Sequence, residues 1–158
     1  MFRPISFEGE EISWREYLKY LSPDDRQNLE EICRRLQSLA KSVPLALVAV
    51  GSVLSNWQNR EPTDIDLLLL PLHKGDANRA EKKFAQFIIA NFPVEEKAGR
   101  IFELNQPKLC VTKNQFWDLK FPAGKIVQIF IRTEQFRCDL AGFKAKAEPM
   151  LTYACWQP

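Results

Sequence analysis

The chain has 158 residues, of which 46% are hydrophobic and 27% are charged. These are ordinary values for a globular protein, and they exclude a disordered or fibrous chain. The length suits one domain with its own core, so we expect a single domain over residues 1–158, with helices in residues 1–43 packed on that core. The formal net charge of +2 is too small to indicate a nucleic-acid or membrane partner on electrostatic grounds.

The sequence predicts a soluble, cytoplasmic protein. Its first residues, MFRPISFEGEE, lack the apolar segment of a secretory signal. No apolar run approaches the ~18 residues of a membrane span, so we expect no membrane partner. The cysteines are far apart and have no C-x-x-C spacing, which favours reduced, mostly buried thiols over a zinc site or a disulfide scaffold. They are Cys33, Cys110, Cys138 and Cys155.

Two helices are predicted near the N-terminus. The segment Ser13–Glu16 has the pattern of a capping box, and an apolar stripe at helical spacing follows it. A second helix begins at Pro23, because proline suits the first helical position and Asp24 and Asp25 favour the positive end of the helix dipole. Its apolar residues repeat at helical spacing to about Lys41, so both helices are expected to pack on the core.

Two short strands and a third helix are predicted in the middle of the chain. Leu45–Val50 and Ile65–Leu70 are continuously apolar, which is typical of buried strands. Residues 51–63 between them are polar and irregular. The segment Asp76–Asn91 has an apolar face at helical spacing and ends shortly before Pro93, so it is predicted to be helical.

The rest of the chain has mainly β character. Candidate strands are Val94–Lys97, Arg100–Leu104, Leu109–Thr112, Phe116–Phe121 and Ile126–Ile131. The last two flank a predicted hairpin turn at residues 122–125. The tail is expected to add a short helix near Phe136–Leu140 and a last strand near Leu151–Trp156. This order of elements predicts an α+β fold, in which a mixed β-sheet carries its helices mainly on one face.

Asp64 and Asp66 stand at the start of the second apolar strand. Side chains alternate between the faces of a strand, so the two carboxylates are expected on one side, ~7 Å apart along the chain, with Ile65 pointing into the core. Carboxylates beside apolar surroundings repel each other and resist ionisation unless a positive group lies between them. Oxygen ligands of this kind favour Mg²⁺ or Mn²⁺ over zinc. The pair therefore predicts a metal site.

Gly51 and Ser52 follow the preceding strand. A residue without Cβ lets the backbone approach a ligand closely. Ser52 would open a turn or helix whose N–H groups, with its hydroxyl, can receive phosphate oxygens. If the two apolar strands are neighbours, phosphate donors and metal carboxylates face one pocket. That is the layout that Mg-nucleotide chemistry requires.

The run VAVGSVLSNWQNREPTDIDLLLL, residues 48–70, resembles the signature of the nucleotidyltransferase superfamily, which has the DNA polymerase beta-like fold. Its pattern is an apolar strand, Gly-Ser, about ten intervening residues and then Asp-apolar-Asp-apolar. Here Ser52 precedes Asp64 by twelve positions. Arg60 and Thr63 stand where small family members often carry a basic residue and a Ser or Thr. The resemblance covers about a quarter of the chain and is fairly specific, because its constraints must hold in order.

The resemblance implies a small single-domain nucleotidyltransferase. Such a protein transfers a nucleotidyl group from a nucleoside triphosphate, such as ATP, to an acceptor that can be a protein, an RNA or a small molecule. Gly51, Ser52 and Arg60 would then contact the triphosphate. Asp64 and Asp66 would ligate two Mg²⁺ ions, one holding the triphosphate and the other lowering the pKa of the acceptor hydroxyl for in-line attack at the α-phosphorus.

Active members of this family usually supply a third carboxylate from a later strand, where it binds the nucleophile-side metal and can act as the base. The corresponding strand here is Ile126–Ile131, which contains no acid. Val127 or Gln128 takes the position. A neutral amide such as Gln128 can orient a water or a ribose, but it is a poor replacement for a charged metal ligand.

Two residues are candidates for the third carboxylate. Asp118 lies on the partner strand of the predicted hairpin, and Asp139 follows the hairpin. The alternative for Asp118 is a solvent-facing charge that pairs with Lys120 or Lys125 on an exposed hairpin. With Asp118 in the site, the catalytic set would be Asp64, Asp66 and Asp118.

Three hypotheses for the function follow from this pattern. The first is an active Mg²⁺-dependent or Mn²⁺-dependent nucleotidyltransferase. The second is a catalytically degenerate nucleotide-binding or protein-interaction module of the same fold, such as one partner of a toxin–antitoxin-like pair. The third is a structural domain with a coincidental motif. The position of Asp118 relative to Asp64 and Asp66 separates the first hypothesis from the second.

Overall fold

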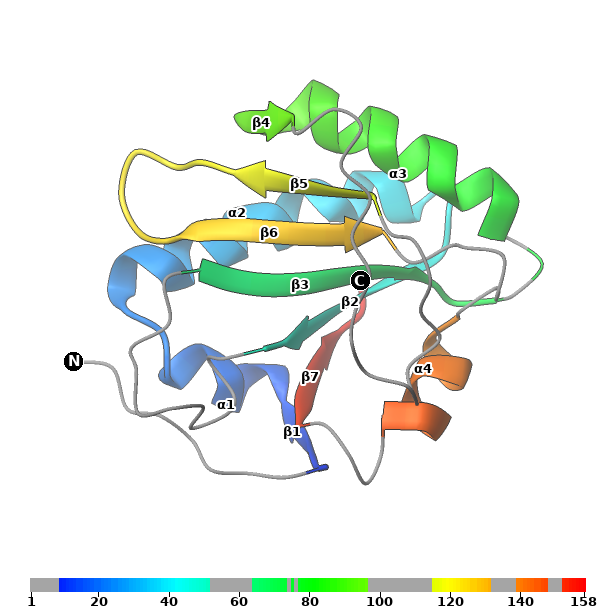
Figure 1. Cartoon of the computed structure of the whole chain (residues 1–158), viewed down its shortest axis with the longest axis horizontal. Coiled ribbons are helices and arrows are strands. Elements are labelled where there is room, and N and C mark those ends of the chain that lie inside the picture. The colour runs from blue at the N-terminus through cyan, green and yellow to red at the C-terminus, as the bar shows by residue number, and fades with distance from the viewer. Residues whose placement is uncertain are drawn as a thin grey trace.

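The computed structural model describes residues 9–51, 64–73, 75, 77–96, 115–131, 139–147 and 152–158, and the statements below concern these residues. They form one mixed β-sheet with helices packed on its faces (Figure 1). The strands are β1 (Glu11–Ser13), β2 (Leu45–Val50), β3 (Asp64–Pro71), β4 (Val94–Glu96), β5 (Gln115–Leu119), β6 (Ile126–Ile131) and β7 (Tyr153–Trp156). Their order across the sheet is β1-β7-β2-β3-β6-β5-β4.

Strand β3 lies in the middle of this sheet. It runs antiparallel to β2 on one side and parallel to β6 on the other. Beyond β6, the antiparallel strands β5 and β4 complete one half of the sheet. Beyond β2, the other half consists of β7 and β1. Because β2 and β3 are neighbours with Val50 opposite Asp66, Gly51 and the Asp-x-Asp pair meet at the same end of the sheet.

The helices are α1 (Trp14–Lys19), α2 (Pro23–Ala40), α3 (Ala77–Asn91) and α4 (Leu140–Ala147). The first two begin where the sequence predicts. The Ser13 hydroxyl accepts a hydrogen bond from the Glu16 N–H at 3.1 Å, and the Ser22 hydroxyl accepts one from the Asp25 N–H at 3.2 Å. These bonds satisfy N–H groups that have no partner inside the helix. None of the helices described here is long and apolar enough to cross a membrane.

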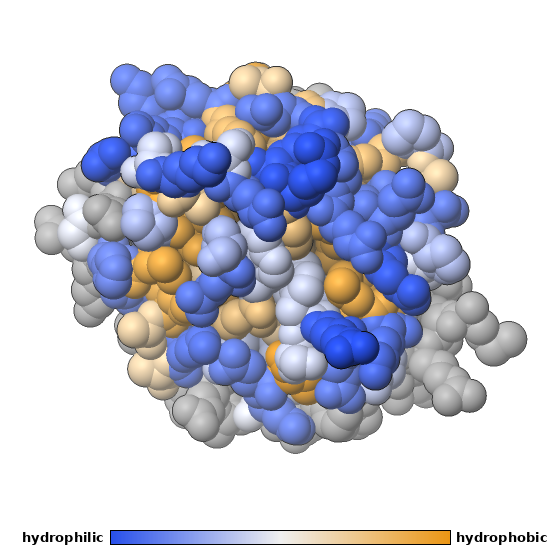
Figure 2. All heavy atoms as spheres, turned by 180° about the vertical axis from the view of Figure 1, so that it is seen from behind, coloured by the Kyte–Doolittle hydropathy of each residue, from blue (hydrophilic) through white to orange (hydrophobic). Residues whose placement is uncertain are grey.

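The two faces of the sheet carry separate apolar clusters. On one face, Ile65 and Leu67 of β3 belong to a core that also contains residues of α1, α2 and α3. On the other face, Leu68 and Leu70 cluster with Leu140 of α4. Figure 1 shows α2 passing behind the strands, and the view from behind shows a mainly hydrophilic outer surface with smaller hydrophobic areas (Figure 2). The predicted α+β class, with a mixed sheet and helices mainly on one face, is confirmed.

The C-terminal part of the chain differs from the prediction. The sequence predicts a helix near residues 136–140, whereas α4 begins at Leu140 and extends to Ala147. Asp139 caps this helix, because its Oδ1 accepts a hydrogen bond from the Gly142 N–H at 2.7 Å. Gly142 lowers the helix propensity of the segment, which hides α4 in the sequence.

Two further differences concern strands. The short strand β1 is not predicted by the sequence, because its three residues are held by long-range pairing with β7 rather than by local preference. The predicted strands at residues 100–104 and 109–112 lie outside the described residues. The predicted strands near residues 45–50, 65–70, 94–97, 116–121, 126–131 and 151–156 correspond to β2, β3, β4, β5, β6 and β7.

Asp25 of α2 anchors the turn between β5 and β6. Its side chain is only 1% exposed. The carboxylate accepts hydrogen bonds from the Lys125 N–H at 2.7 Å and from the Lys125 ammonium at 3.0 Å. One turn further along α2, the Asn28 amide donates to the Ala123 carbonyl at 2.7 Å. The helix thereby fixes the position of the hairpin, and with it the residues that β5 and β6 present on the opposite face.

Candidate active site

Asp64 and Asp66 lie at the start of β3, on the sheet face opposite α2 and α3. The predicted alternation is observed, because Ile65 is fully buried in the helix-covered core while both carboxylates are half-buried on the other side. Leu68 continues this face into the cluster under α4. The acidic pair therefore lies beside an apolar region but is itself open enough to contact a ligand.

Asp118 lies in the same row of the sheet as Asp66. Gln128 of β6 is the register partner of Asp66 on one side and of Asp118 on the other. Residues directly opposite each other on paired strands project to the same face. The structure therefore brings Asp118 to the acidic face, with Gln128 between the two carboxylates. Of Val127 and Gln128, it is Gln128 that occupies the position next to Asp66.

The prediction that Asp118 could be a solvent-facing charge is wrong. Its side chain is only 3% exposed. Lys125 forms its ion pair with Asp25 of α2, on the other side of the sheet. Asp118 is thus a buried carboxylate whose charge acts on the acids of β3.

The three carboxylates interact electrostatically. Burial raises the pKa of Asp66 to about 7, and the negative charges of Asp64 and Asp118 add to this effect. Burial also raises the pKa of Asp64, again with a contribution from Asp118. An ionised carboxylate in such surroundings favours any positive charge that enters the site. Perturbed acids that act on one another in this way are characteristic of functional sites.

Gly51 borders the acidic pair. Its φ of +91° is a conformation that residues with side chains rarely adopt. A Cβ at this position would overlap the Asp66 carboxylate and would lie 3.1 Å from the Asp66 Cβ. The glycine thus leaves the space in which the Asp66 carboxylate lies, and the approach of its backbone to a ligand stays a prediction.

We expect Gly51→Ala to destabilise the protein by about 1–3 kcal/mol and to weaken divalent-cation binding. The added methyl group strains the left-handed backbone and displaces the Asp66 carboxylate. Chemical denaturation and titration with Mn²⁺ measure the two effects. Gly75→Ala is the matched control, because its Cβ would meet nothing within 4 Å. Equal behaviour of the two variants would contradict the assigned role of Gly51.

The other predicted site residues fall into two groups. Asp139 is buried at the start of α4, where it caps the helix, so it is not the third carboxylate. Ser52 and Arg60, predicted to contact the triphosphate, lie outside the described residues. The structural anchor Asp25 is not apparent in the sequence, because its partner Lys125 is a hundred positions away and no local pattern connects them.

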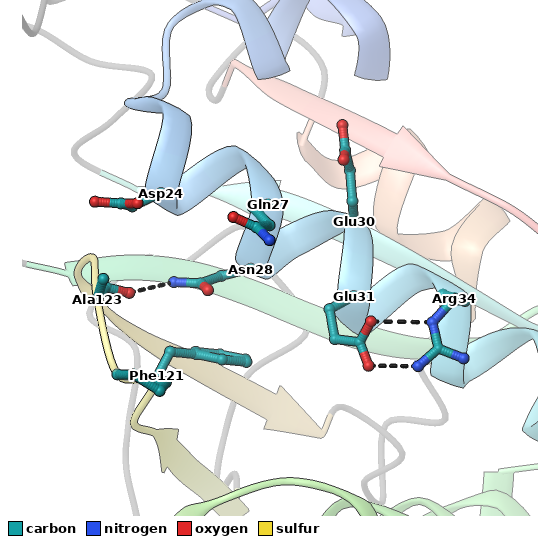
Figure 3. A pocket seen from close by; sticks show the side chains of 9 residues that line it. Asp24, Gln27, Asn28, Glu30, Glu31, Arg34, Phe121 and Ala123 are labelled. Atoms are coloured by element: carbon teal, nitrogen blue, oxygen red, sulfur yellow. Dashed lines mark hydrogen bonds and ion pairs between the residues drawn. The ribbon is translucent and has the colours of Figure 1, made fainter.

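A separate pocket of about 520 Å³ lies between α2 and the hairpin turn (Figure 3). It is lined by Asp24, Gln27, Asn28, Glu30, Glu31, Arg34, Phe121, Pro122 and Ala123. Several of its polar groups form hydrogen bonds with one another. Figure 3 shows those from Arg34 to Glu31 and from Asn28 to the Ala123 carbonyl. Hydrogen bonds from Arg34 and Arg35 lower the pKa of Glu31 to about 2. Asp64, Asp66 and Asp118 are not among its lining residues, so this pocket is distinct from the acidic site.

The acidic site fits a hard divalent cation that completes its ligands from a substrate. Among the described residues, no three His, Cys, Asp or Glu side chains converge as a complete ligand set. Mg²⁺ is usually bound by one or two carboxylates together with water and substrate phosphates, and it does not require such a set. Asp64 and Asp66 provide two oxygen ligands on one face, and the burial and neighbouring charges that raise the pKa of Asp66 would be offset by a cation bound between them.

Comparison with known proteins finds similarity among solved structures. No protein-family model matches the sequence, and no curated protein matches it. The structure of the Thermotoga maritima CCA-adding enzyme in complex with tRNA is similar with a TM-score of 0.40 and 13% sequence identity. The similar region covers 76% of this chain and 24% of that enzyme's chain, so the chain spans about a quarter of the enzyme's length.

Proposed function

We propose that the protein is a nucleotidyltransferase with the polymerase beta-like fold. It transfers a nucleotidyl group from a nucleoside triphosphate to an acceptor hydroxyl in a reaction that depends on Mg²⁺ or Mn²⁺. The observation that carries this proposal is the row of Asp66, Gln128 and Asp118 beside Asp64, on a half-open face next to Gly51. The Gly-Ser motif twelve positions before Asp64 supports it.

Each residue of the site has a role in this reaction. Asp64 and Asp66 would hold the cation, which when bound supplies positive charge to the triphosphate. Gly51 leaves room for the Asp66 carboxylate and allows the backbone to approach the phosphates. Ser52 and Arg60 are proposed to contact the triphosphate. The reaction takes place in the cytoplasm in this proposal, and its acceptor is a protein, an RNA or a small molecule.

Asp118 is the proposed base. The acceptor oxygen forms a bond to the α-phosphorus, the bond between that phosphorus and the leaving pyrophosphate breaks, and the hydroxyl proton passes to the Asp118 carboxylate. Its position in the row with Asp66 and the effect of its charge on Asp64 and Asp66 support this role. Gln128 lies between Asp118 and Asp66 and would orient the acceptor through its amide.

A second function is favoured by one observation, which is the neutral Gln128 next to Asp66. A degenerate relative of the same fold would bind a nucleoside triphosphate, or a partner protein as in a toxin–antitoxin-like pair, without transferring the nucleotidyl group. In that case the buried Asp118 would have no part in turnover. The two functions predict different results in a transfer assay.

The assay uses α-labelled nucleoside triphosphates with Mg²⁺ and follows label on the protein itself, on RNA and on small hydroxyl compounds. We expect transfer by the wild type and at least a ~1000-fold loss in Asp64→Asn, because a bound cation contributes several kcal/mol to stabilising the transition state. Asp24→Asn, which changes an exposed acid on α2, is the matched control and should retain full activity. Nucleotide binding without transfer in the wild type would favour the degenerate module.

Asp118→Asn is expected to lower the transfer rate by about 10²–10⁴-fold, which is the usual contribution of a positioned general base. Nucleotide affinity should stay within a few-fold of the wild-type value, because Asp118 lies two strands away from the β3 acids. Single-turnover kinetics and calorimetry measure the two quantities separately. A variant with unchanged turnover would rule out the base role.

A further inference from the structure

The arrangement of the strands has a consequence for the number of metal ions. Asp66, Gln128 and Asp118 occupy successive strands β3, β6 and β5 at one level of the sheet. Neighbouring strands are about 4.8 Å apart, so the backbones of Asp66 and Asp118 are separated by roughly twice that distance. The residue in the gap is a neutral amide.

Two catalytic metal ions need shared anionic ligands. Such ions lie about 3.5–4 Å apart, and carboxylates on adjacent positions balance their combined charge. The two positions opposite Asp66 on the neighbouring strands are Val50 of β2 and Gln128 of β6, and neither side chain carries a charge. Asp118 carries a charge, but it is attached one strand further away. The described acids do not converge as a ligand set of three, which agrees with this separation.

We infer that this site binds one divalent cation per chain, held by Asp64 and Asp66, and that Gln128 excludes a second. Asp118 then acts on the acceptor without ligating metal. This inference rests on the proposed function and makes it more specific, because the resemblance alone implies two ions. If Asp118 does not ligate metal, no charged ligand is needed at position 128 between Asp118 and the metal-binding pair.

Counting bound Mn²⁺ by electron paramagnetic resonance tests the inference without any reaction. The full chain is titrated with Mn²⁺ alone, into the millimolar range, in the absence of nucleotide. We expect one ion per chain in the wild type and in Asp118→Asn, and none in Asp66→Asn. Gln128→Asp should bind two ions, because it places a carboxylate directly opposite Asp66. Gln128→Asn introduces a side chain with the shape of aspartate but without its charge, so this variant should bind one ion.

Each other outcome has a distinct meaning. Two ions in the wild type, or a lost ion in Asp118→Asn, would overturn the inference and leave the proposed function standing. One ion in a folded Gln128→Asp, as judged by circular dichroism, would show that Gln128 is not what excludes the second ion. Absence of binding in the wild type would overturn both the inference and the metal-dependent function. The wild-type count is decisive even if a Gln128 variant fails to fold.

Discussion

Asp66→Asn is expected to make the metal-free protein more stable at pH 7 while abolishing its function. The substitution replaces a carboxylate that burial, Asp64 and Asp118 all disfavour in its charged form. The pKa of Asp66 rises from the ordinary 3.8 to about 7, a difference that corresponds to as much as about 4 kcal/mol at neutral pH. Because an amide also forfeits some contacts, we expect a gain of about 2–4 kcal/mol in the free energy of unfolding.

The raised pKa of Asp66 determines how the stability difference between Asp66→Asn and the wild type changes with pH. The folded protein holds the Asp66 proton more tightly than the unfolded chain does, so the stability contributed by this group is fully present below pH 3.8. It is lost as the pH rises towards about 7. The difference in stability between Asp66→Asn and the wild type should therefore be near zero at pH 4 and should grow up to pH 7.

Denaturation of both proteins in chelator, across this pH range, measures the difference. Asp24→Asn serves as the control, because this acid is exposed on α2. Its free energy of unfolding should differ from that of the wild type by the same small amount at every pH. Addition of Mg²⁺ should then stabilise the wild type but not Asp66→Asn, since ligands that bind only the folded state raise its stability. Destabilisation by Asp66→Asn at pH 7 would mean that the carboxylate has a structural partner in the protein and is not a metal ligand.

Asp25→Ala is expected to lower the free energy of unfolding by about 3 kcal/mol. Removing one member of a buried ion pair leaves the other without compensation. Here the Lys125 N–H and ammonium would both lose their acceptor, and the hairpin would lose its link to α2. Since the hairpin carries Gln128 and Asp118, we also expect reduced nucleotidyl transfer in the fraction that folds.

Denaturant unfolding of Asp25→Ala beside Asp24→Ala measures this effect with a matched control. The two acids are neighbours in the first turn of α2, but Asp24 is exposed and its loss should cost less than about 1 kcal/mol. Burial alone would raise the pKa of Asp25, but the hydrogen bonds from Lys125 and Ser22 outweigh it and lower the pKa. The stability supplied by Asp25 is therefore present at neutral pH and is lost as the pH falls through its lowered pKa.

Gly124→Ala provides an independent check of the same contact. The glycine has a φ of +94°, and a Cβ there would lie 2.6 Å from Asp25 Oδ1 and 2.7 Å from Asn28 Nδ2. We expect a loss of stability comparable to that of Asp25→Ala, because the added methyl group pushes the turn away from α2. If both variants were as stable as the wild type, α2 would not be the anchor of the hairpin.

Features that depend on neighbouring residues could be predicted from the sequence. The alternation of β3 places Asp64 and Asp66 on one face, and the apolar residues between and after them fix that choice. The starts of α1 and α2 follow from Ser13 and from Ser22-Pro23, whose hydrogen bonds stay within one turn of helix. The α+β class follows from the order of such elements.

Features that depend on distant pairing could not be predicted. The position of Asp118 requires knowing that β5 pairs with β6, that β6 pairs with β3, and that both pairings share the level of Gln128. A shift of one residue in either register would have turned Asp118 away from the acids. Asp25 and Lys125 are separated by a hundred positions, and Asp139 serves a helix that glycine conceals.

The most direct test of the metal-nucleotide site is a calorimetric titration of the metal-free protein with non-hydrolysable analogues of ATP, GTP, CTP and UTP. The proposed function predicts that at least one analogue binds in Mg²⁺, and that this binding disappears in chelator and in Asp66→Asn. Binding that is equally strong in wild type and Asp66→Asn, or no binding of any analogue by the wild type in Mg²⁺, would contradict it.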